Sequence, residues 1–313
     1  MNKDGRISYS AWKKYTTCPK LYDYHYNKRL RPTGKGSPLY FGVAIDAALN
    51  VMLLKSGDYL QTFRDFFKFE DLTDCVWSDK DWDADLFTDD QLDTLKDATM
   101  DKKIWACMRV KGRILLEAYE EQILPLIEEV HSVQLELPDR PGFSDAIVTI
   151  KGFGKVLIDN KTASRPYQRD AVTKDTQLAL YAKSLGLSRA GFVVLNKRIN
   201  KNKKKICTTC GFDGSYTRHK TCASEATGIR CHGTWEESVN PQAYIQLLID
   251  DVPDINKILI SESITDVEDA INKKVFPRNL NACDKMYGKP CPYYNMCYNN
   301  DDDGLTIEFK EKK

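Results

Sequence analysis

The chain has 313 residues, of which 42% are hydrophobic and 29% are charged, and its formal net charge is +1. This length and composition allow one large domain, or a core with one or two small appendages, and exclude a disordered chain. The net charge excludes an overall basic footprint, so any surface that binds nucleic acid must be local. Because no signal-like N-terminus or long uncharged apolar run is visible, we expect no membrane span and a reducing cytosolic compartment.

The first part of the chain has the pattern of helices. Residues 8–27 start with serines that can cap a helix, and residues 39–56 are apolar on most sides, as in a buried helix. Residues 57–128 also have helical composition, interrupted by an acidic stretch from Asp79 to Asp101 and with Pro125 near their end. We therefore expect long helices around a core that follows later in the chain.

The period then changes to that of strands. Residues 133–137 alternate apolar and polar, and the apolar runs 146–148 and 156–158 are separated by two glycines, which predicts a tight hairpin. Residues 173–186 return to helical spacing and end on a glycine, and residues 190–196 are a further buried strand. This order predicts a compact α/β fold.

The remaining third divides into three segments. Residues 197–235 are lysine-rich and then cysteine-rich, with too few large apolar residues to fold by hydrophobic burial alone. Residues 241–274 are predicted to be helical, and residues 276–299 to be irregular.

Two acidic residues and a lysine lie together on the predicted hairpin. Asp145 begins the second strand, Asp159 ends the third, and Lys161 follows two residues later, so Asp159 and Lys161 share one face of the strand. Carboxylates of this kind hold Mg²⁺ or Mn²⁺, the metal activates a water, and a lysine orients that water or stabilises developing charge. Taken alone, the same residues are more typical of a salt-bridged strand end.

Further motifs give this hairpin a family context. Three motifs follow one another along the chain. They are the segment ISYSAWKKYTTCPKLYDYHY, the hairpin FSDAIVTIKGFGKVLIDNKTA, and the pair Gln177 and Tyr181 in TQLALYA. Together they resemble the RecB-like branch of the PD-(D/E)xK nuclease superfamily, which includes AddB nuclease domains and the iron–sulfur CRISPR-adaptation exonucleases. The resemblance implies a restriction-endonuclease-like core, with a central mixed sheet flanked by helices, and places Gln177 and Tyr181 in the catalytic centre with Asp145, Asp159 and Lys161.

One position departs from the family pattern. Many relatives carry histidine as a metal ligand in a G-x-x-x-H helix, whereas here Gly42 is followed by Asp46. Aspartate also binds a hard cation, so the resemblance implies Asp46 as a ligand of Mg²⁺ or Mn²⁺, together with Asp145, Asp159 and Asn160. The alternative for Asp46 is a helix-surface residue.

Cysteines near both ends of the chain form one candidate metal site. In iron–sulfur members of the family, one cysteine follows the opening helix and three lie near the C-terminus, which implies that Cys18, Cys283, Cys291 and Cys297 bind a [4Fe–4S] cluster. Such a cluster would clamp the C-terminal segment to the first helix. A set of four cysteines also suits zinc, and four unrelated buried cysteines are the remaining alternative.

A second cysteine group stands outside the family resemblance. Cys207, Cys210, Cys222 and Cys231 have the C-x2-C knuckle and the two later cysteines of a tetrahedral zinc site. A segment this polar needs a metal to fold, so we predict a structural zinc in a zinc-ribbon-like insertion. His219 and His232 are possible substitutes for one of the four ligands.

Basic residues immediately precede this insertion. They are typical of a solvated loop. Alternatively, they form an arm that binds DNA phosphates and is held near the active centre by the zinc knuckle. The DNA-binding candidates are Lys197, Arg198, Lys201, Lys203, Lys204 and Lys205.

These features predict a metal-dependent exonuclease that acts on DNA ends, favours single strands and serves recombination, repair or phage DNA metabolism in a bacterial or phage-infected cytoplasm. The chain has no P-loop motif, so any unwinding would come from a helicase or recombination partner. A CRISPR-adaptation-type nuclease and a non-catalytic zinc-containing DNA-binding scaffold are the alternatives. Expected divisions are residues 1–196 for the helical region and nuclease core, 197–236 for the basic arm and zinc insertion, and 237–313 for the C-terminal helix and cluster-binding segment.

Overall fold

The centre of the molecule is a five-stranded mixed sheet. The computed structural model describes residues 5–210, 222, 231–283 and 290–308. The strand order is β10-β7-β6-β5-β4, in which β6 and β7 run parallel and the other neighbours are antiparallel. The bounds of these strands are Ile127–Glu136 for β4, Phe143–Ile150 for β5, Gly154–Ala163 for β6, Arg189–Asn196 for β7 and Ile245–Asp251 for β10. The predicted α/β class is confirmed.

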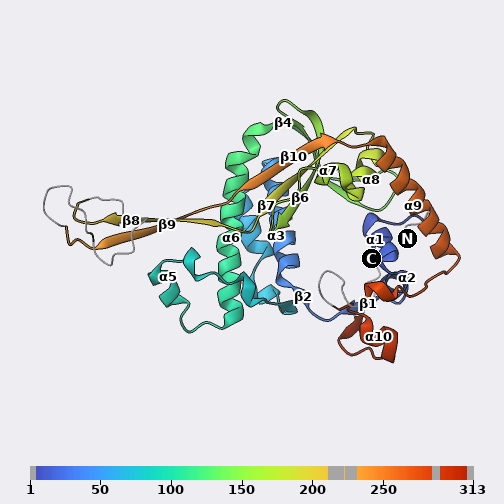
Figure 1. Ribbon diagram of the computed structural model, residues 1–313, viewed down its shortest axis with the longest axis horizontal. Helices are drawn as coiled ribbons and strands as arrows, with labels where there is room; N and C mark the ends of the chain where they lie inside the picture. Colours follow the sequence, from blue (N-terminus) through green and yellow to red (C-terminus); the bar gives the residue numbers. More distant parts are fainter. Residues whose placement is uncertain (1–4, 211–221, 223–230, 284–289, 309–313) are drawn as a thin grey trace.

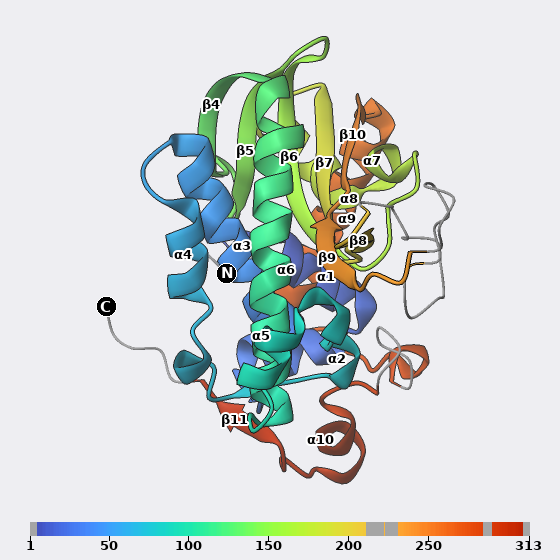
Figure 2. The same cartoon turned by 90° about the vertical axis from the view of Figure 1, so that its left-hand side faces the viewer.

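Helices cover both faces of this sheet (Figures 1 and 2). One face carries α3 (Ser37–Leu54), α4 (Tyr59–Phe66) and α6 (Met100–Gln122), and the other carries α8 (Thr176–Ser184) and α9 (Asp254–Asn272). Alternate strand residues enter the two resulting cores, as the two-residue period of a strand requires.

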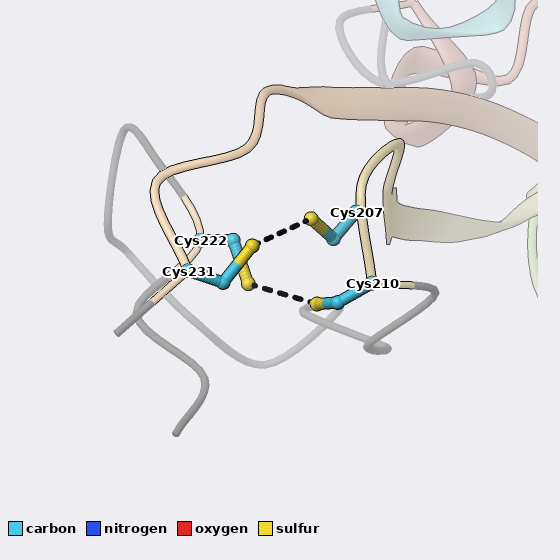
Figure 3. A group of neighbouring side chains, drawn as sticks. All are labelled: Cys207, Cys210, Cys222 and Cys231. Carbon is cyan, nitrogen blue, oxygen red and sulfur yellow. Dashed lines mark hydrogen bonds between the residues drawn. The ribbon is translucent and has the colours of Figure 1, made fainter. Parts of the chain in front are cut away.

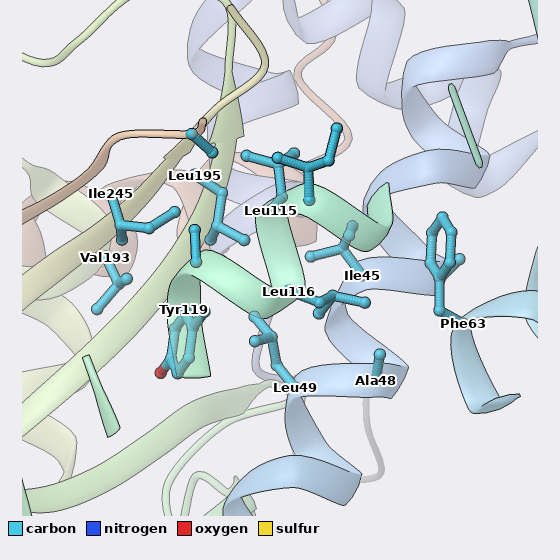
Figure 4. Packing of buried hydrophobic residues seen from close by; sticks show 14 of the residues in the cluster. Ile45, Ala48, Leu49, Phe63, Leu115, Leu116, Tyr119, Val193, Leu195 and Ile245 are labelled. Carbon is cyan, nitrogen blue, oxygen red and sulfur yellow. The ribbon is translucent and has the colours of Figure 1, made fainter. Parts of the chain in front are cut away.

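The larger core lies under α3 and α6. Figure 4 shows Leu49, Leu116 and Tyr119 from these helices close to Val193 and Leu195 of β7. The continuous apolar character of 39–56 therefore reflects helix burial against both neighbouring helices and the sheet. By length and composition α3 alone among the described helices could cross a membrane, and its side chains at Phe41, Ala44, Ala48 and Leu49 are fully buried in this core.

Several short helices connect these layers, and two of the predicted helices are divided into shorter ones. The first segment divides into α1 (Tyr9–Thr17), α2 (Pro19–Tyr22) and a π-helical turn (Asp23–Asn27), with the Ser8 hydroxyl accepting from the Ala11 amide at the start of α1. The predicted helix 173–186 is likewise divided, because Asp175 ends α7 (Ala171–Lys174) and caps α8. The other short helices are α5 (Asp89–Thr94) and α10 (Tyr294–Asn299), the latter lying in the segment predicted to be irregular.

The predicted helix over residues 241–274 is wrong in its first half. Residues 245–251 form the edge strand β10, paired antiparallel with β7 from Ile245↔Leu195 to Asp251↔Arg189. Burial against α6 and pairing with β7 decide this conformation, which local helical composition did not reveal. The helix α9 begins only after Pro253, which occupies its N-cap.

The lysine-rich segment is a strand, and it leads away from the core. β8 (Asn200–Cys207) pairs antiparallel with β9 (Trp235–Gln242), and this two-stranded arm projects far beyond α6 (Figure 1). Because β7 and β10 are themselves antiparallel neighbours, the arm prolongs their pairing outwards. The expectation of a solvated loop is therefore wrong, because backbone pairing gives this polar segment an extended form. The alternative of an arm held near the active centre does not match Figure 1, in which the arm leads away from the core.

The C-terminal segment packs on the N-terminal helices. β1 (Leu30–Pro32) pairs with β11 (Leu305–Ile307), and the Tyr293 hydroxyl donates to the Leu30 carbonyl at 2.9 Å. The Tyr15 hydroxyl donates to the Val275 carbonyl at 2.6 Å. A further short parallel pair joins β2 (Lys35–Gly36) to β3 (Cys75–Val76).

One glycine permits the close approach of α4 and α6. A Cβ atom added at Gly112 would overlap the buried Phe63 ring, which is itself stacked on Phe67. We expect Gly112→Ala to lower the free energy of unfolding by about 1–3 kcal/mol, because overpacking outweighs the gain in helix propensity. Denaturant unfolding measures this. Gly57→Ala is the control, since its Cβ would meet Val51 at an ordinary 3.7 Å, and equal stability of the two variants would contradict the packing.

Candidate active site

The site is built where two strands of the sheet separate. β5 and β6 pair from Ile150↔Gly154 to Ala146↔Ile158, and beyond that point β6 continues beside β7. Asp145 and Asp159 are the next residues on their strands, so both lie at this fork. The Asn160 amide donates to Asp145 Oδ2 at 2.7 Å across it. Asp159 does not end its strand as predicted, because parallel pairing with β7 extends β6 to Ala163.

Asp159 is the hub of the polar contacts at the fork. Its Oδ2 atom lies 2.6 Å from Lys161 Nζ, on the strand face that the spacing of two residues predicted. Its Oδ1 atom accepts from Gln177 Nε2 at 3.3 Å. Gln177 stands in the first turn of α8, whose N-cap is Asp175, and Tyr181 lies one turn further along, beside Gly142. The structure thus brings Lys161, Gln177 and Tyr181 to the same side of the fork as Asp159.

Asp46 approaches the fork from α3. It lines a cavity of about 440 Å³ together with Asp145, Asn160 and Lys161. Asn50 Nδ2 and Gln134 Nε2 donate to its carboxylate at 3.4 and 3.3 Å. Asp46 is therefore placed at the site.

The carboxylates at the fork are costly to ionise. Burial, together with the charge of Asp46, raises the pKa of Asp145 to about 6. Burial raises the pKa of Asp159 to about 7, with Asp145 adding to the shift and Lys161 opposing it. Burial also raises the pKa of Asp46. These are the directions expected for carboxyl groups that share a desolvated site without a cation.

The donor atoms fit a hard divalent cation. Three carboxylates offer the oxygen ligands that Mg²⁺ and Mn²⁺ prefer, and a bound cation would offset their mutual repulsion. The side-chain oxygen and nitrogen of Asn160 are buried beside them and have no hydrogen-bond partner among the described residues. Asp46, Asp145, Asp159 and Asn160 could therefore hold such an ion.

Gln134 is a site residue that sequence reasoning missed. Its neighbours Val133 and Leu135 pair with Ala146 and Ser144, which puts Gln134 opposite Asp145. Its φ of 51° is rare for a residue other than glycine, and such strain is common at functional sites. Alternation along β4 predicted only a polar partner at this position, and no sequence signal marks its backbone conformation.

Comparison with known proteins gives the same assignment as the geometry. A profile of the PD-(D/E)XK nuclease superfamily matches residues 6–298. The chain belongs to this superfamily. Membership implies a nuclease that acts on DNA with a divalent metal, Mg²⁺ or Mn²⁺. A comparison with curated proteins gave no match.

The nuclease also carries four cysteines at the tip of its arm (Figure 3). The thiols of Cys207, Cys210, Cys222 and Cys231 all lie within 4.8 Å of one another, as one tetrahedral ion requires. Amides two residues further on donate to Cys207 and Cys231, each at 3.4 Å, which forms two knuckles. Gly233 is needed here, because a Cβ atom would lie 2.7 Å from Cys207 Sγ. His219 lies outside the described residues, and His232 is exposed.

Four further cysteines lie between the N-terminal helices and the C-terminal segment. Cys18, between α1 and α2, accepts from the Asn279 amide at 3.4 Å, and Cys283 donates to the Asn279 carbonyl at 3.6 Å. The Cys291 amide donates to the Cys283 carbonyl at 2.7 Å. Burial raises the pKa of Cys291, and the neighbouring thiols of Cys283, Cys18 and Cys297 raise it further.

Of the six DNA-binding candidates, two precede the arm and four lie in its first strand. Lys197 is half-buried, and burial lowers its pKa, with Asp81 opposing this shift. Arg198 is exposed, and its amide donates to Asn196 Oδ1. The backbone of Lys201, Lys203, Lys204 and Lys205 lies in β8, whereas their side chains lie outside the described residues.

The electrostatics of the fork predict how one isosteric change alters stability. The folded pKa of Asp145 exceeds its unfolded value, so its contribution to stability is present below about pH 4 and is lost as the pH rises through about 6. With EDTA, Asp145→Asn should therefore be more stable than the wild type at pH 8, by up to about 3 kcal/mol, and equal to it near pH 4. Unfolding at the two pH values measures the difference.

Manganese supplies the control for this comparison. Because binding to the folded state stabilises it, Mn²⁺ at pH 8 should raise the melting temperature of the wild type more than that of Asp145→Asn. A variant that is less stable than the wild type at pH 8 in EDTA would refute the proposed cost of ionising buried Asp145.

Proposed function

We propose that the nuclease is a RecB-like exonuclease that hydrolyses phosphodiester bonds at DNA ends and favours single strands. The observation that carries the proposal is the set of contacts at Asp159, which meets Lys161 and Gln177 at the fork that also holds Asp145. A purely structural ion pair would not require a second buried carboxylate, a third from α3 and a glutamine aimed at the same group.

The chain's own residues divide the chemistry between them. A divalent cation supplies a Lewis acid and an activated water when bound, and Asp46, Asp145, Asp159 and Asn160 would hold it. Lys161 carries the positive charge that stabilises the negative charge developing on the phosphate oxygens. Burial lowers the pKa of Lys161, but Asp159 outweighs burial and keeps that lysine protonated. Gln177 holds Asp159 in place through its hydrogen bond, and Tyr181 of α8 covers the same side of the centre.

Recombination, repair or phage DNA metabolism in a bacterial or phage-infected cytoplasm is the proposed setting. The RecB-like motifs support it, and a helicase partner would supply single strands. The alternative of a non-catalytic scaffold is disfavoured, because the contacts among Asp159, Lys161 and Gln177 are all present.

The cysteines near the two ends are proposed to bind a [4Fe–4S] cluster. Cys18, Cys291 and Cys297 lie in a small apolar cluster with Leu21 and Tyr293. The Cys291 amide donates to the Cys283 carbonyl, which places Cys283 beside them. Four thiolates are the usual ligands of such a cluster, in which each binds a different iron. The cluster would reinforce the contact that β1–β11 pairing already makes between the ends of the chain.

The arm is proposed to hold a structural zinc. Its four-thiol geometry and polar sequence support this, since no apolar cluster among the described residues includes the four cysteines of the arm. The chain is likewise proposed to divide into a nuclease core (1–196), this arm (197–236) and a C-terminal part (237–313). The C-terminal part contributes β10 and α9 to the core.

Replacing the site lysine tests the catalytic proposal. Lys161→Ala should lower cleavage of end-labelled single-stranded DNA with Mg²⁺ or Mn²⁺ by about 10³-fold or more, because it removes charge stabilisation at the phosphate. Binding of the same DNA in EDTA should persist. The exposed Lys155 lies on the same strand and supplies the control Lys155→Ala.

The outcome separates three possibilities. Full activity of Lys161→Ala would remove it from the catalytic centre. A wild type that binds DNA but never cleaves it would favour the scaffold, and cleavage of RNA with DNA left intact would overturn the substrate.

Colour tests the cluster. Anaerobically purified nuclease should be brown and contain iron and sulfide, and Cys291→Ser should lose both because one thiolate ligand is removed. Cys75→Ser is the matched control, since Cys75 belongs to neither group of four. Colourless wild-type protein with two zinc ions per chain would contradict the cluster and leave the nuclease proposal intact.

Zinc content tests the arm. Cys210→Ser and Gly233→Ala should each release the arm's zinc, the first by removing a ligand and the second by crowding Cys207. Elemental analysis measures the loss, and the melting temperature of the nuclease core should change little. Retention of zinc in Cys210→Ser would show that this residue is not a ligand.

A further inference from the structure

A largely apolar cavity with two lysines at its wall lies along α1, outside the metal centre. It has a volume of about 300 Å³, and α1 contributes Ser10, Lys13, Lys14 and Thr17 to its lining. These residues follow the i, i+3, i+4, i+7 spacing of one helix face, which we call the α1 basic face. The rest of the lining includes His25 and Tyr293 and contains no aspartate or glutamate.

The two lysines of this face lack an anionic partner. Lys13 Nζ lies 5.9 Å from the centre of the Tyr9 ring, and Lys14 Nζ lies 5.9 Å from that of Tyr26. Neither makes an ion pair with a carboxylate in the described part of the chain. Burial lowers the pKa of Lys14, and the nearby Arg31 lowers it further. Cations placed together in this way favour a bound anion, which would offset their repulsion.

The helix α1, which carries this face, lies between two sites of the nuclease. At its start, the Tyr9 hydroxyl shares a hydrogen bond of 2.8 Å with Thr176, the residue before Gln177 of the metal centre. At its end, α1 stops at Cys18, and Pro292 and Tyr293 line the cavity next to Cys291. Seven residues of helix span about 10 Å, the length of about three nucleotides of one strand.

We propose that the α1 basic face binds the backbone phosphates of a single DNA strand that runs from the metal centre towards the Cys18 group. The proposal rests on the nuclease function and names a path for its substrate. Lys13 and Lys14 contact the phosphates, while the hydroxyls of Ser10 and Thr17 lie on the same face. Such contacts hold the strand's position without reading its sequence, as phosphate contacts do.

Salt-dependent binding tests this path. Full-length protein, kept anaerobic, is mixed with a fluorescent single-stranded oligothymidylate in EDTA, and anisotropy is measured over a range of salt concentrations. Lys13→Gln/Lys14→Gln should weaken binding about tenfold or more and reduce the slope of log affinity against log salt by about 1.4, or about 0.7 for each lost contact. The adjacent lysines of α6 supply the matched control, Lys102→Gln/Lys103→Gln, which should bind as the wild type does.

A second variant guards against a folding defect. Ser10→Glu leaves both lysines in place and adds a negative charge at an exposed position of the same face, so it too should weaken binding while melting temperature and iron content stay unchanged. Wild-type affinity and salt slope in both α1 variants, or no binding of DNA by the wild type, would overturn the path.

Cleavage measured in parallel separates this proposal from the nuclease function. If the wild type cleaves DNA and the α1 variants bind it normally, the path fails and the function stands. If the wild type binds but does not cleave and the variants lose binding, the path stands and the nuclease function fails.

Discussion

The parting of β6 from β5 is the constraint on which the site depends. β6 must leave its antiparallel partner and pair in parallel with β7, and this leaves Asp145 and Asp159 facing each other just past the last pair of the hairpin. The Asn160 amide that β5 no longer uses for strand pairing donates instead to Asp145. One change of partner thus positions both carboxylates, and the two-residue period of β6 adds Lys161 on the same side.

This arrangement has an energetic cost that explains the rest of the centre. Buried carboxylates repel one another, and the pKa values of Asp145 and Asp159 rise to about 6 and 7. Lys161 offsets part of the repulsion, and a cation held by Asp46 from α3 would offset the remainder. The backbone of Gln134 has the conformation that lets its amide reach Asp46. Ionising the centre without a cation is therefore costly, and a bound metal would offset that cost.

Local pattern predicted only part of the centre: the family resemblance supplied Asp46, Gln177 and Tyr181, and tertiary pairing fixed what neither could predict. Alternation and two glycines predicted the hairpin, and spacing placed Asp159 and Lys161 on one face, because strand geometry is local. The edge strand β10 was mistaken for helix, since only its pairing with β7 distinguishes the two. The direction of the arm and the positive φ of Gln134 were also hidden, because long-range contacts fix both.

The most direct test of a metal-dependent centre at this fork is the position of the metal itself. Crystals of the nuclease soaked with Mn²⁺ at pH 8, where the carboxylates are ionised, would show the ion by its anomalous scattering. We expect a peak coordinated by Asp145 and Asp159, with Asp46 completing the carboxylate ligands. A fork without Mn²⁺ at saturating concentration, or a peak bound elsewhere with Lys161 still paired to Asp159, would contradict it.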